Sequence, residues 1–171
     1  MNDLKQYIRD IPDFPKEGIL FRDITTLLGS SEKFREVVDK LAERYAGKDI
    51  DAVVAVEARG FIFGSALAYK LGAALVPVRK KGKLPFKTFS ATYTLEYGKD
   101  SLEIHEDAFK PGARVLLIDD LLATGGTLGA VVELVKKLKG EIQEIVFVIE
   151  LSDLKGREKI KDFPVYSMVK Y

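Results

Sequence analysis

The chain contains no cysteine, so disulfide bonds, thiolate catalysis and cysteine-bound metals are excluded among its 171 residues. Its one histidine, His105, also excludes a metal site built from several histidines. No apolar stretch approaches the ~18 residues that a membrane span requires. The first residues do not join a basic segment to an apolar one, as a signal peptide does. We therefore expect a soluble, cytoplasmic protein that does not bind membranes.

Charge of either sign is nearly balanced, with 27 basic and 26 acidic residues and a net charge of +1. A chain without a basic excess lacks the electrostatic footprint of a nucleic-acid-binding protein. The hydrophobic content of 47% is sufficient for a folded core. Because no repeat, low-complexity tract or linker interrupts it, a single domain over residues 1–171 is expected.

Apolar runs and helical patterns alternate along most of the chain. Strands that are apolar throughout and are separated by helices indicate a parallel sheet covered on both faces, so the predicted fold class is α/β. Between residues 79 and 106 the period changes to strict alternation, which is typical of a hairpin. The expected strands are 52–56, 74–78, 114–119, 144–150 and 165–169, the expected helices are 3–11, 30–46, 61–71 and 127–139, and residues 13–24 are expected to be irregular.

The most informative segment runs from Val115 to Thr127. An apolar run ends in Asp119 and Asp120, and a short turn with two glycines leads into a helical pattern. Small residues let backbone N–H groups approach an anion, and the start of the helix adds its positive end. Carboxylates beside a phosphate would repel it unless they face sugar hydroxyls or a phosphate-bound metal. The pattern therefore predicts a site for a phosphorylated ribose.

Other interpretations of this segment are weaker. A Walker-B-type metal site would require a P-loop, and the chain has no G-x-x-x-x-G-K-[S/T]. A dinucleotide fingerprint would require glycine at the position of Thr124, and two acids before the loop would suit a pyrophosphate badly. An ordinary strand–turn–helix with acidic turn residues remains the alternative.

Two more groups of charged residues follow strands of the predicted sheet. Arg59 comes directly after the strand 52–56, where its forked guanidinium suits phosphate oxygens, although an ion pair with Glu57 is an equal alternative. The basic cluster 79–83 follows the next strand, and such clusters are usually solvated. Ligands of parallel sheets bind outside the carboxyl ends of the strands. We therefore expect both groups to meet Asp119 and Asp120 at one rim.

Three further side chains have two interpretations each. Glu96 and Tyr97 lie near the tip of the predicted hairpin, which can close over a site and exclude water or be an ordinary surface hairpin. Phe21 can stack on a planar base or anchor an irregular loop to the core. The residues alone do not decide between these possibilities.

With these motifs in place, the chain resembles the type I phosphoribosyltransferases, in particular those that act on adenine. The signature is Val115–Thr127, and the similarity covers about residues 13–157. The resemblance implies a central, mainly parallel sheet flanked by helices, with a small N-terminal hood over residues 1–30 and a flexible hairpin lid over 79–106. The other matching segments are 13–15, 21–24, 58–61, 79–85, 93–98 and 154–158.

The resemblance further implies a reaction. Adenine and phosphoribosyl pyrophosphate (PRPP) give AMP and diphosphate in purine salvage, with magnesium held mainly by substrate oxygens and water, and such enzymes are usually homodimers. One alternative is a phosphoribosyltransferase for a 6-oxopurine. Another is a non-catalytic regulator that senses PRPP, although such proteins carry an additional DNA-binding domain.

Roles for individual residues are implied by the same resemblance. Asp119 and Asp120 would face the ribose hydroxyls and stabilise positive charge. The 5′-phosphate would bind to Ala123, Thr124, Gly125, Gly126 and Thr127. The pyrophosphate would bind to Arg59 and Lys83, with the Glu57–Ala58 peptide in the cis form. Leu20, Phe21 and Arg22 would form the adenine pocket. On the lid, Glu96 would exchange a proton with adenine and Tyr97 would help to seal the site.

Overall fold

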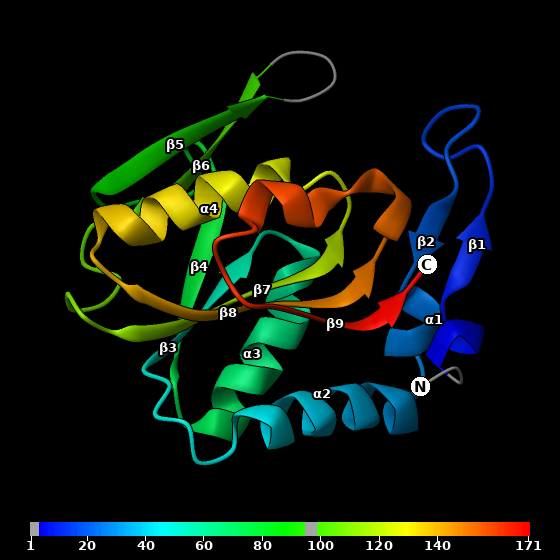
Figure 1. Cartoon of the computed structure of the whole chain (residues 1–171), viewed down its shortest axis with the longest axis horizontal. Coiled ribbons are helices and arrows are strands. Elements are labelled where there is room, and N and C mark those ends of the chain that lie inside the picture. Colours follow the sequence, from blue (N-terminus) through cyan, green and yellow to red (C-terminus); the bar gives the residue numbers. More distant parts are fainter. Residues whose placement is uncertain (1–3, 95–98) are drawn as a thin grey trace. The chain divides into compact units, whose positions relative to one another are not determined.

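The computed structural model of the chain describes residues 4–94 and 99–171, coloured along the sequence in Figure 1. Contacts within the chain define two units, residues 1–44 and residues 45–171. The single domain, the hood and the lid expected from the sequence stay predictions. No helix in the described ranges combines the length and the apolar character that crossing a membrane requires.

The N-terminal unit contains a short antiparallel strand pair. A 3₁₀ turn, η1 (Leu4–Tyr7), precedes β1 (Arg9–Ile11), which pairs with β2 (Phe21–Asp23). The helices α1 (Thr25–Leu28) and α2 (Ser31–Tyr45) follow. The helix predicted over residues 3–11 is only a 3₁₀ turn followed by a strand, so that prediction was wrong. The irregular structure predicted over 13–24 was wrong only at Phe21–Asp23, which is a strand. Arg9–Ile11 and Phe21–Asp23 are strands because they pair with each other, which a local pattern does not reveal.

The larger unit is built on a seven-stranded sheet with the order β5-β6-β4-β3-β7-β8-β9. The strands β3, β4, β7, β8 and β9 are parallel, while β6 runs antiparallel to both β4 and β5. This arrangement confirms the predicted α/β class. The bounds are β3 (Ala52–Val56), β4 (Ala74–Lys80), β5 (Thr88–Thr94), β6 (Lys99–His105), β7 (Arg114–Leu122), β8 (Glu141–Glu150) and β9 (Val165–Lys170).

Two helices, α3 (Arg59–Leu71) and α4 (Gly126–Lys137), cover opposite faces of this sheet (Figure 1). The alternation of side chains in β3 explains why both faces are apolar. Val54 and Val56 belong to the core cluster that contains Val131 of α4. Ala55 faces the other way, where a Cβ atom added to Gly64 of α3 would lie 2.5 Å from the Ala55 Cβ. Strands covered on both faces are apolar at every position, as the sequence shows.

Two short 3₁₀ segments, η2 (Ser152–Leu154) and η3 (Gly156–Ile160), connect β8 to β9. Ile160 at the end of η3 is buried in the same core cluster as α4. This connection therefore lies against the helix that follows the glycine turn, and it becomes important for the site.

Candidate active site

The two adjacent carboxylates lie inside β7 and not beyond its end. The strand was expected to stop at Asp119, but it continues to Leu122, and Asp119 pairs with Phe147 of β8. Asp120 is only 4% exposed, and its backbone N–H donates to Asp119 Oδ1 at 2.8 Å. The continued pairing with β8 explains the longer strand, because cross-strand hydrogen bonds outweigh the poor strand propensity of aspartate. The carboxylates are therefore held by a rigid element near its carboxyl end.

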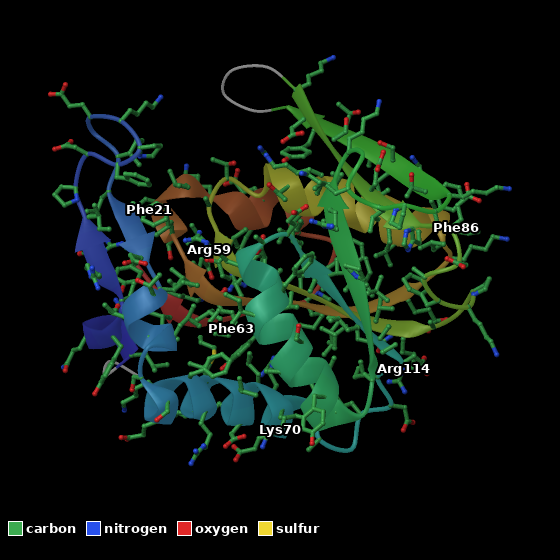
Figure 2. All side chains as sticks on the ribbon, turned by 180° about the vertical axis from the view of Figure 1, so that it is seen from behind. Phe21, Arg59, Phe63, Lys70, Phe86 and Arg114 are labelled. Atoms are coloured by element: carbon green, nitrogen blue, oxygen red, sulfur yellow. The ribbon has the colours of Figure 1, made fainter. Side chains whose placement is uncertain are left out.

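Arg59 is the partner of this carboxylate pair. Its Nε lies 2.9 Å from Asp120 Oδ2, and Figure 2 shows it at the start of α3. Glu57, the alternative ion-pair partner, is instead bonded to Arg79, whose Nη2 donates to Glu57 Oε1 at 2.8 Å. A guanidinium beside a buried acid offsets part of the cost of burying that charge.

Burial changes the acidity of the carboxylate pair. It raises the pKa of Asp119 well above the ordinary value of 3.8, and the negative charge of Asp120 raises it further. Burial also raises the pKa of Asp120, although the Arg59 guanidinium acts in the opposite direction. Two adjacent acids in a buried place therefore resist full ionisation, even with Arg59 beside them.

The glycine turn between β7 and α4 forms a small anion-sized hollow. A cavity of about 80 Å³ is lined by residues 121–128 together with Asp119. Gly125 has a φ of 76°, a left-handed conformation that glycine adopts without strain. α4 begins at Gly126, so its first backbone N–H groups have no partner within the helix. Such a helix start is suited to binding an anion.

A second, larger cavity of about 230 Å³ adjoins the first, and the two share Asp119, Leu121 and Thr127 in their linings. The larger cavity receives residues from β3, β4, β5 and β7, so the strand ends meet at one rim as the sequence predicts. Its predicted site residues are Glu57, Ala58, Arg59, Asp119, Asp120 and Thr127, and it is also lined by Val56, Lys80, Tyr93, Leu102 and Leu121.

The turn from β3 into α3 brings Glu57 and Ala58 to this cavity. The Glu57–Ala58 peptide bond is cis, as the resemblance implies. Glu57 Oε2 accepts a hydrogen bond from the Lys80 N–H at 3.1 Å, and the Arg79 guanidinium lowers the pKa of Glu57. The charge of Lys83 lowers this pKa slightly further, but Lys83 is not among the residues that line the larger cavity.

Lys80 of the predicted basic cluster 79–83 lines this cavity, and so does Tyr93, which was given no role from the sequence. Lys80 Nζ lies 3.1 Å from Asp100 Oδ2, and the Tyr93 hydroxyl donates to the same oxygen at 3.4 Å. Asp100 raises the pKa of Lys80, while burial is the main cause of the raised pKa of Tyr93. Tyr93 and Asp100 are opposite each other in the β5–β6 ladder. Only the register of the predicted hairpin could have indicated that Tyr93 and Asp100 join Lys80.

The residues expected to form a base pocket belong to the N-terminal unit. Leu20 is 46% exposed, and the Phe21 ring lies 5.1 Å from the Phe14 ring in an edge-to-face arrangement. Arg22 forms an ion pair with Asp10 on the neighbouring strand. Glu96 and Tyr97 lie outside the residues that the structure describes.

The fold and the site together have the features of a domain that binds a phosphorylated sugar. A family model described as "Phosphoribosyl transferase domain" matches residues 25–170. An adenine phosphoribosyltransferase from Geobacter metallireducens is 61% identical over 171 residues, which is the whole of both chains.

Solved structures give the same result. The adenine phosphoribosyltransferase of Thermoanaerobacter pseudethanolicus superposes with a TM-score of 0.96 at 50% identity over 99% of both chains. That of Saccharomyces cerevisiae, complexed with adenine and an imino-altritol bisphosphate, gives a TM-score of 0.93 at 43% identity over 98% of this chain and 97% of that one. The chain therefore belongs to the phosphoribosyltransferase family, in its adenine phosphoribosyltransferase branch.

Proposed function

We propose that the protein transfers the 5-phosphoribosyl group of PRPP to adenine, giving AMP and diphosphate. The observation that carries this proposal is the pair of adjoining cavities that share Asp119, Leu121 and Thr127. One cavity is an anion hollow at a helix start, and the other contains a carboxylate pair beside Arg59. A ribose with a phosphate at C5 and a leaving group at C1 matches that order of groups.

The 5′-phosphate is assigned to the turn between Ala123 and Thr127. Its backbone N–H groups and the start of α4 offer donors and a partial positive charge to the phosphate oxygens. The twelve-residue helix is long enough for this end effect. Because the turn is held between a strand and a helix, the phosphate fixes the position of the whole sugar.

The carboxylates are assigned to the ribose. When the bond between C1 and the diphosphate oxygen breaks, positive charge develops on C1 and the ring oxygen. Asp119 and Asp120 then lie where they accept hydrogen bonds from the sugar hydroxyls and stabilise that charge, as preorganised groups do in a water-poor site. The raised pKa of Asp119 falls as positive charge approaches, so the charged form is favoured when it is needed.

The diphosphate is assigned to Arg59 and Lys83, with the cis peptide of Glu57 and Ala58 next to them. Arg59 and Glu57 both line the larger cavity, and the charge of Lys83 acts on Glu57. Lys80, also in the lining, adds a third cation. Several cations are needed because the leaving group acquires negative charge as the bond breaks.

Magnesium fits this site. Glu57, Asp119 and Asp120 line the cavity with carboxylate oxygens, the hard donors that Mg²⁺ prefers. Asp119 and Asp120 would hold it through water, together with oxygens of the substrate. When bound, the metal supplies charge neutralisation for the diphosphate.

The base is assigned to Leu20, Phe21 and Arg22. Phe21 would stack on the adenine ring, and backbone groups of its two neighbours would read the amino edge. The bond from N9 to C1 forms as the diphosphate leaves, and the N9 proton passes to Glu96, with Tyr97 closing the lid. The motif resemblance supports these roles, as it supports a homodimer. The cytoplasmic location stays a prediction.

A magnesium-dependent assay tests the proposal. Purified protein is given PRPP with adenine, hypoxanthine or guanine in parallel, and nucleotide formation is followed by absorbance and chromatography. We expect AMP from adenine and at least about 10⁴-fold lower kcat/KM with the 6-oxopurines, because a pocket that pairs with an amino group leaves donors or acceptors unpaired on an oxo group. Preference for a 6-oxopurine would contradict the base assignment, and no turnover with any base would contradict the function.

A further inference from the structure

The backbone of Gly156, in the connection between β8 and β9, lies directly behind the glycine turn. A Cβ atom added to Gly156 would lie 2.2 Å from the carbonyl oxygen of Ala123 and 3.1 Å from the backbone N of Gly125. A Cβ atom added to Gly125 would in turn lie 2.5 Å from the Gly156 carbonyl oxygen. Gly125 and Gly156 therefore pack backbone to backbone, with no space for a methyl group on either residue.

Arg157, the next residue, is fastened to the end of β8. Its Nε and Nη2 each donate to a different oxygen of Glu150 at 2.7 Å, and Nη1 donates to the carbonyl oxygen of Val165 at 3.0 Å. Nη2 also lies 3.3 Å from the hydroxyl of Ser167. Glu150 is only 5% exposed. A two-pronged, charge-assisted bond to a buried carboxylate holds a guanidinium in one orientation.

The Arg157–Glu150 pair and the glycine turn are connected through one pair of opposite residues in the sheet. Glu150 is opposite Leu122, the residue that immediately precedes the turn, and the Leu151 N–H donates to the Leu122 carbonyl oxygen at 2.9 Å. Ile160 anchors the other end of η3 in the core beneath α4. The segment 156–160 is therefore held by Arg157 near one end and by Ile160 at the other, and Gly156 packs against the glycine turn.

We infer that Gly156 and Arg157 are positioning residues for the phosphate turn: they set the direction of its backbone N–H groups without touching the substrate. This inference rests on the proposed function, because it assumes that a phosphate binds at this turn. Neither residue lines either cavity within the described residues. Their effect is therefore on how well a 5′-phosphate binds, and not on the diphosphate, which is assigned to residues on other strands.

The test compares two ligands on the same protein. The dissociation constants of ribose 5-phosphate, which carries only the 5′-phosphate, and of magnesium pyrophosphate, which occupies only the leaving-group side, are measured by calorimetry for wild type and Gly156→Ala. We expect ribose 5-phosphate to bind at least about tenfold more weakly to the variant, since one misdirected N–H bond to a charged oxygen is worth that factor. Pyrophosphate binding is expected to change by less than twofold.

Two further variants make the result specific. Gly129→Ala places the same methyl group on α4, where nothing lies within 4 Å of it, and it is expected to bind both ligands like wild type. Arg157→Lys keeps the charge but loses the fork, and it is expected to weaken ribose 5-phosphate in the same direction, because a lysine holds Glu150 through one point. If Gly156→Ala does not fold, Arg157→Lys answers the question alone.

The outcomes separate the two proposals. Wild-type protein that binds neither ligand and forms no AMP contradicts the proposed function. Wild-type protein that forms AMP, combined with folded variants that bind ribose 5-phosphate normally or lose both ligands equally, overturns the positioning role. A selective loss of ribose 5-phosphate, with a raised KM for PRPP and an unchanged KM for adenine, supports it.

Discussion

The carboxyl groups in and near this site differ in the charged groups that surround them. Glu57 and Glu150 each contact an arginine, which lowers the pKa of both carboxyls. Asp119 lies beside another carboxylate in a buried place, and its pKa is raised. The arginine contacts of Glu57 and Glu150 stabilise the folded state at neutral pH, whereas the buried charge of Asp119 destabilises it.

Because the buried charge of Asp119 is unfavourable, removing that charge is expected to stabilise the folded protein. Because the folded state raises this pKa, the contribution of Asp119 is most favourable below the ordinary value of 3.8 and is lost as pH rises through the raised value. Asp119→Asn removes the charge, so we expect a free energy of unfolding higher on the order of 1 kcal/mol at pH 7, with the difference vanishing in acid. Thermal melts between pH 3 and pH 8 measure this.

The same substitution is expected to reduce turnover. An amide cannot stabilise positive charge on the ribose, and losing one such group typically lowers kcat by roughly 10²-fold. The control is Asp107→Asn, because Asp107 is exposed and lies outside both cavities. An Asp119→Asn enzyme that is less stable than wild type at neutral pH, or equally active, would contradict this account.

At the scale of elements, the site depends on how closely α3 lies on the sheet. Gly64 on α3 faces Ala55 of β3 and Ile118 of β7, with 2.5 Å and 3.1 Å between its missing Cβ and their carbon atoms. α3 carries Arg59 at its first position, and Ile118 directly precedes Asp119. The distance between the helix and the sheet therefore sets where the guanidinium meets the carboxylate pair.

Gly64→Ala tests this contact. We expect it to lower the free energy of unfolding by about 1–3 kcal/mol, because the added methyl group overpacks the interface and outweighs the better helix propensity of alanine. Denaturant unfolding measures the change. The matched variant Gly129→Ala on α4 has open space and is expected to be neutral or slightly stabilising. Equal stability of the two variants would contradict this expectation, because it would mean that α3 shifts readily to accommodate the added methyl group.

At the scale of the whole molecule, basic and acidic residues almost cancel, and the sequence pI is about 7.8. Net charge therefore has little effect on stability, and the response to acid depends on the few carboxyls whose pKa the fold changes. The Arg157–Glu150 pair connects the end of β8 to β9 through Val165 and Ser167. Glu150 is a buried carboxylate whose pKa is lowered, and it accepts two bonds from the Arg157 guanidinium at 2.7 Å.

Glu150→Gln is expected to show the acid limb of stability. Since the pKa of Glu150 is lowered in the fold, its contribution is present above the ordinary value of 4.5 and is lost as pH falls through the lowered value. We expect the variant to be less stable by roughly 2 kcal/mol at pH 7, with the difference shrinking below that range. Glu158→Gln, at an exposed position of η3, is the control. A difference that persists unchanged at pH 3 would contradict the charge-based explanation.

The sheet-and-helix core and one edge of the site follow from the amino-acid sequence alone. Strands 52–56 and 165–169 and helix 30–46 are found within two residues of their expected bounds, because apolar periodicity reports local burial directly. The glycine turn was readable from its residue types, and the meeting of strand ends at one rim from the parallel arrangement of the predicted strands. Residue types and spacing along one chain segment carry that information.

Which charged side chains form pairs depends instead on contacts made when the chain folds. Arg59 could have paired with Glu57, and its pairing with Asp120 follows from the placement of α3 on β7, which are far apart in sequence. The strands Arg9–Ile11 and Phe21–Asp23, the Lys80–Asp100 contact and the packing of Gly156 on the turn arise in the same way. Each is a contact between distant segments, and its geometry exists only once the chain has folded.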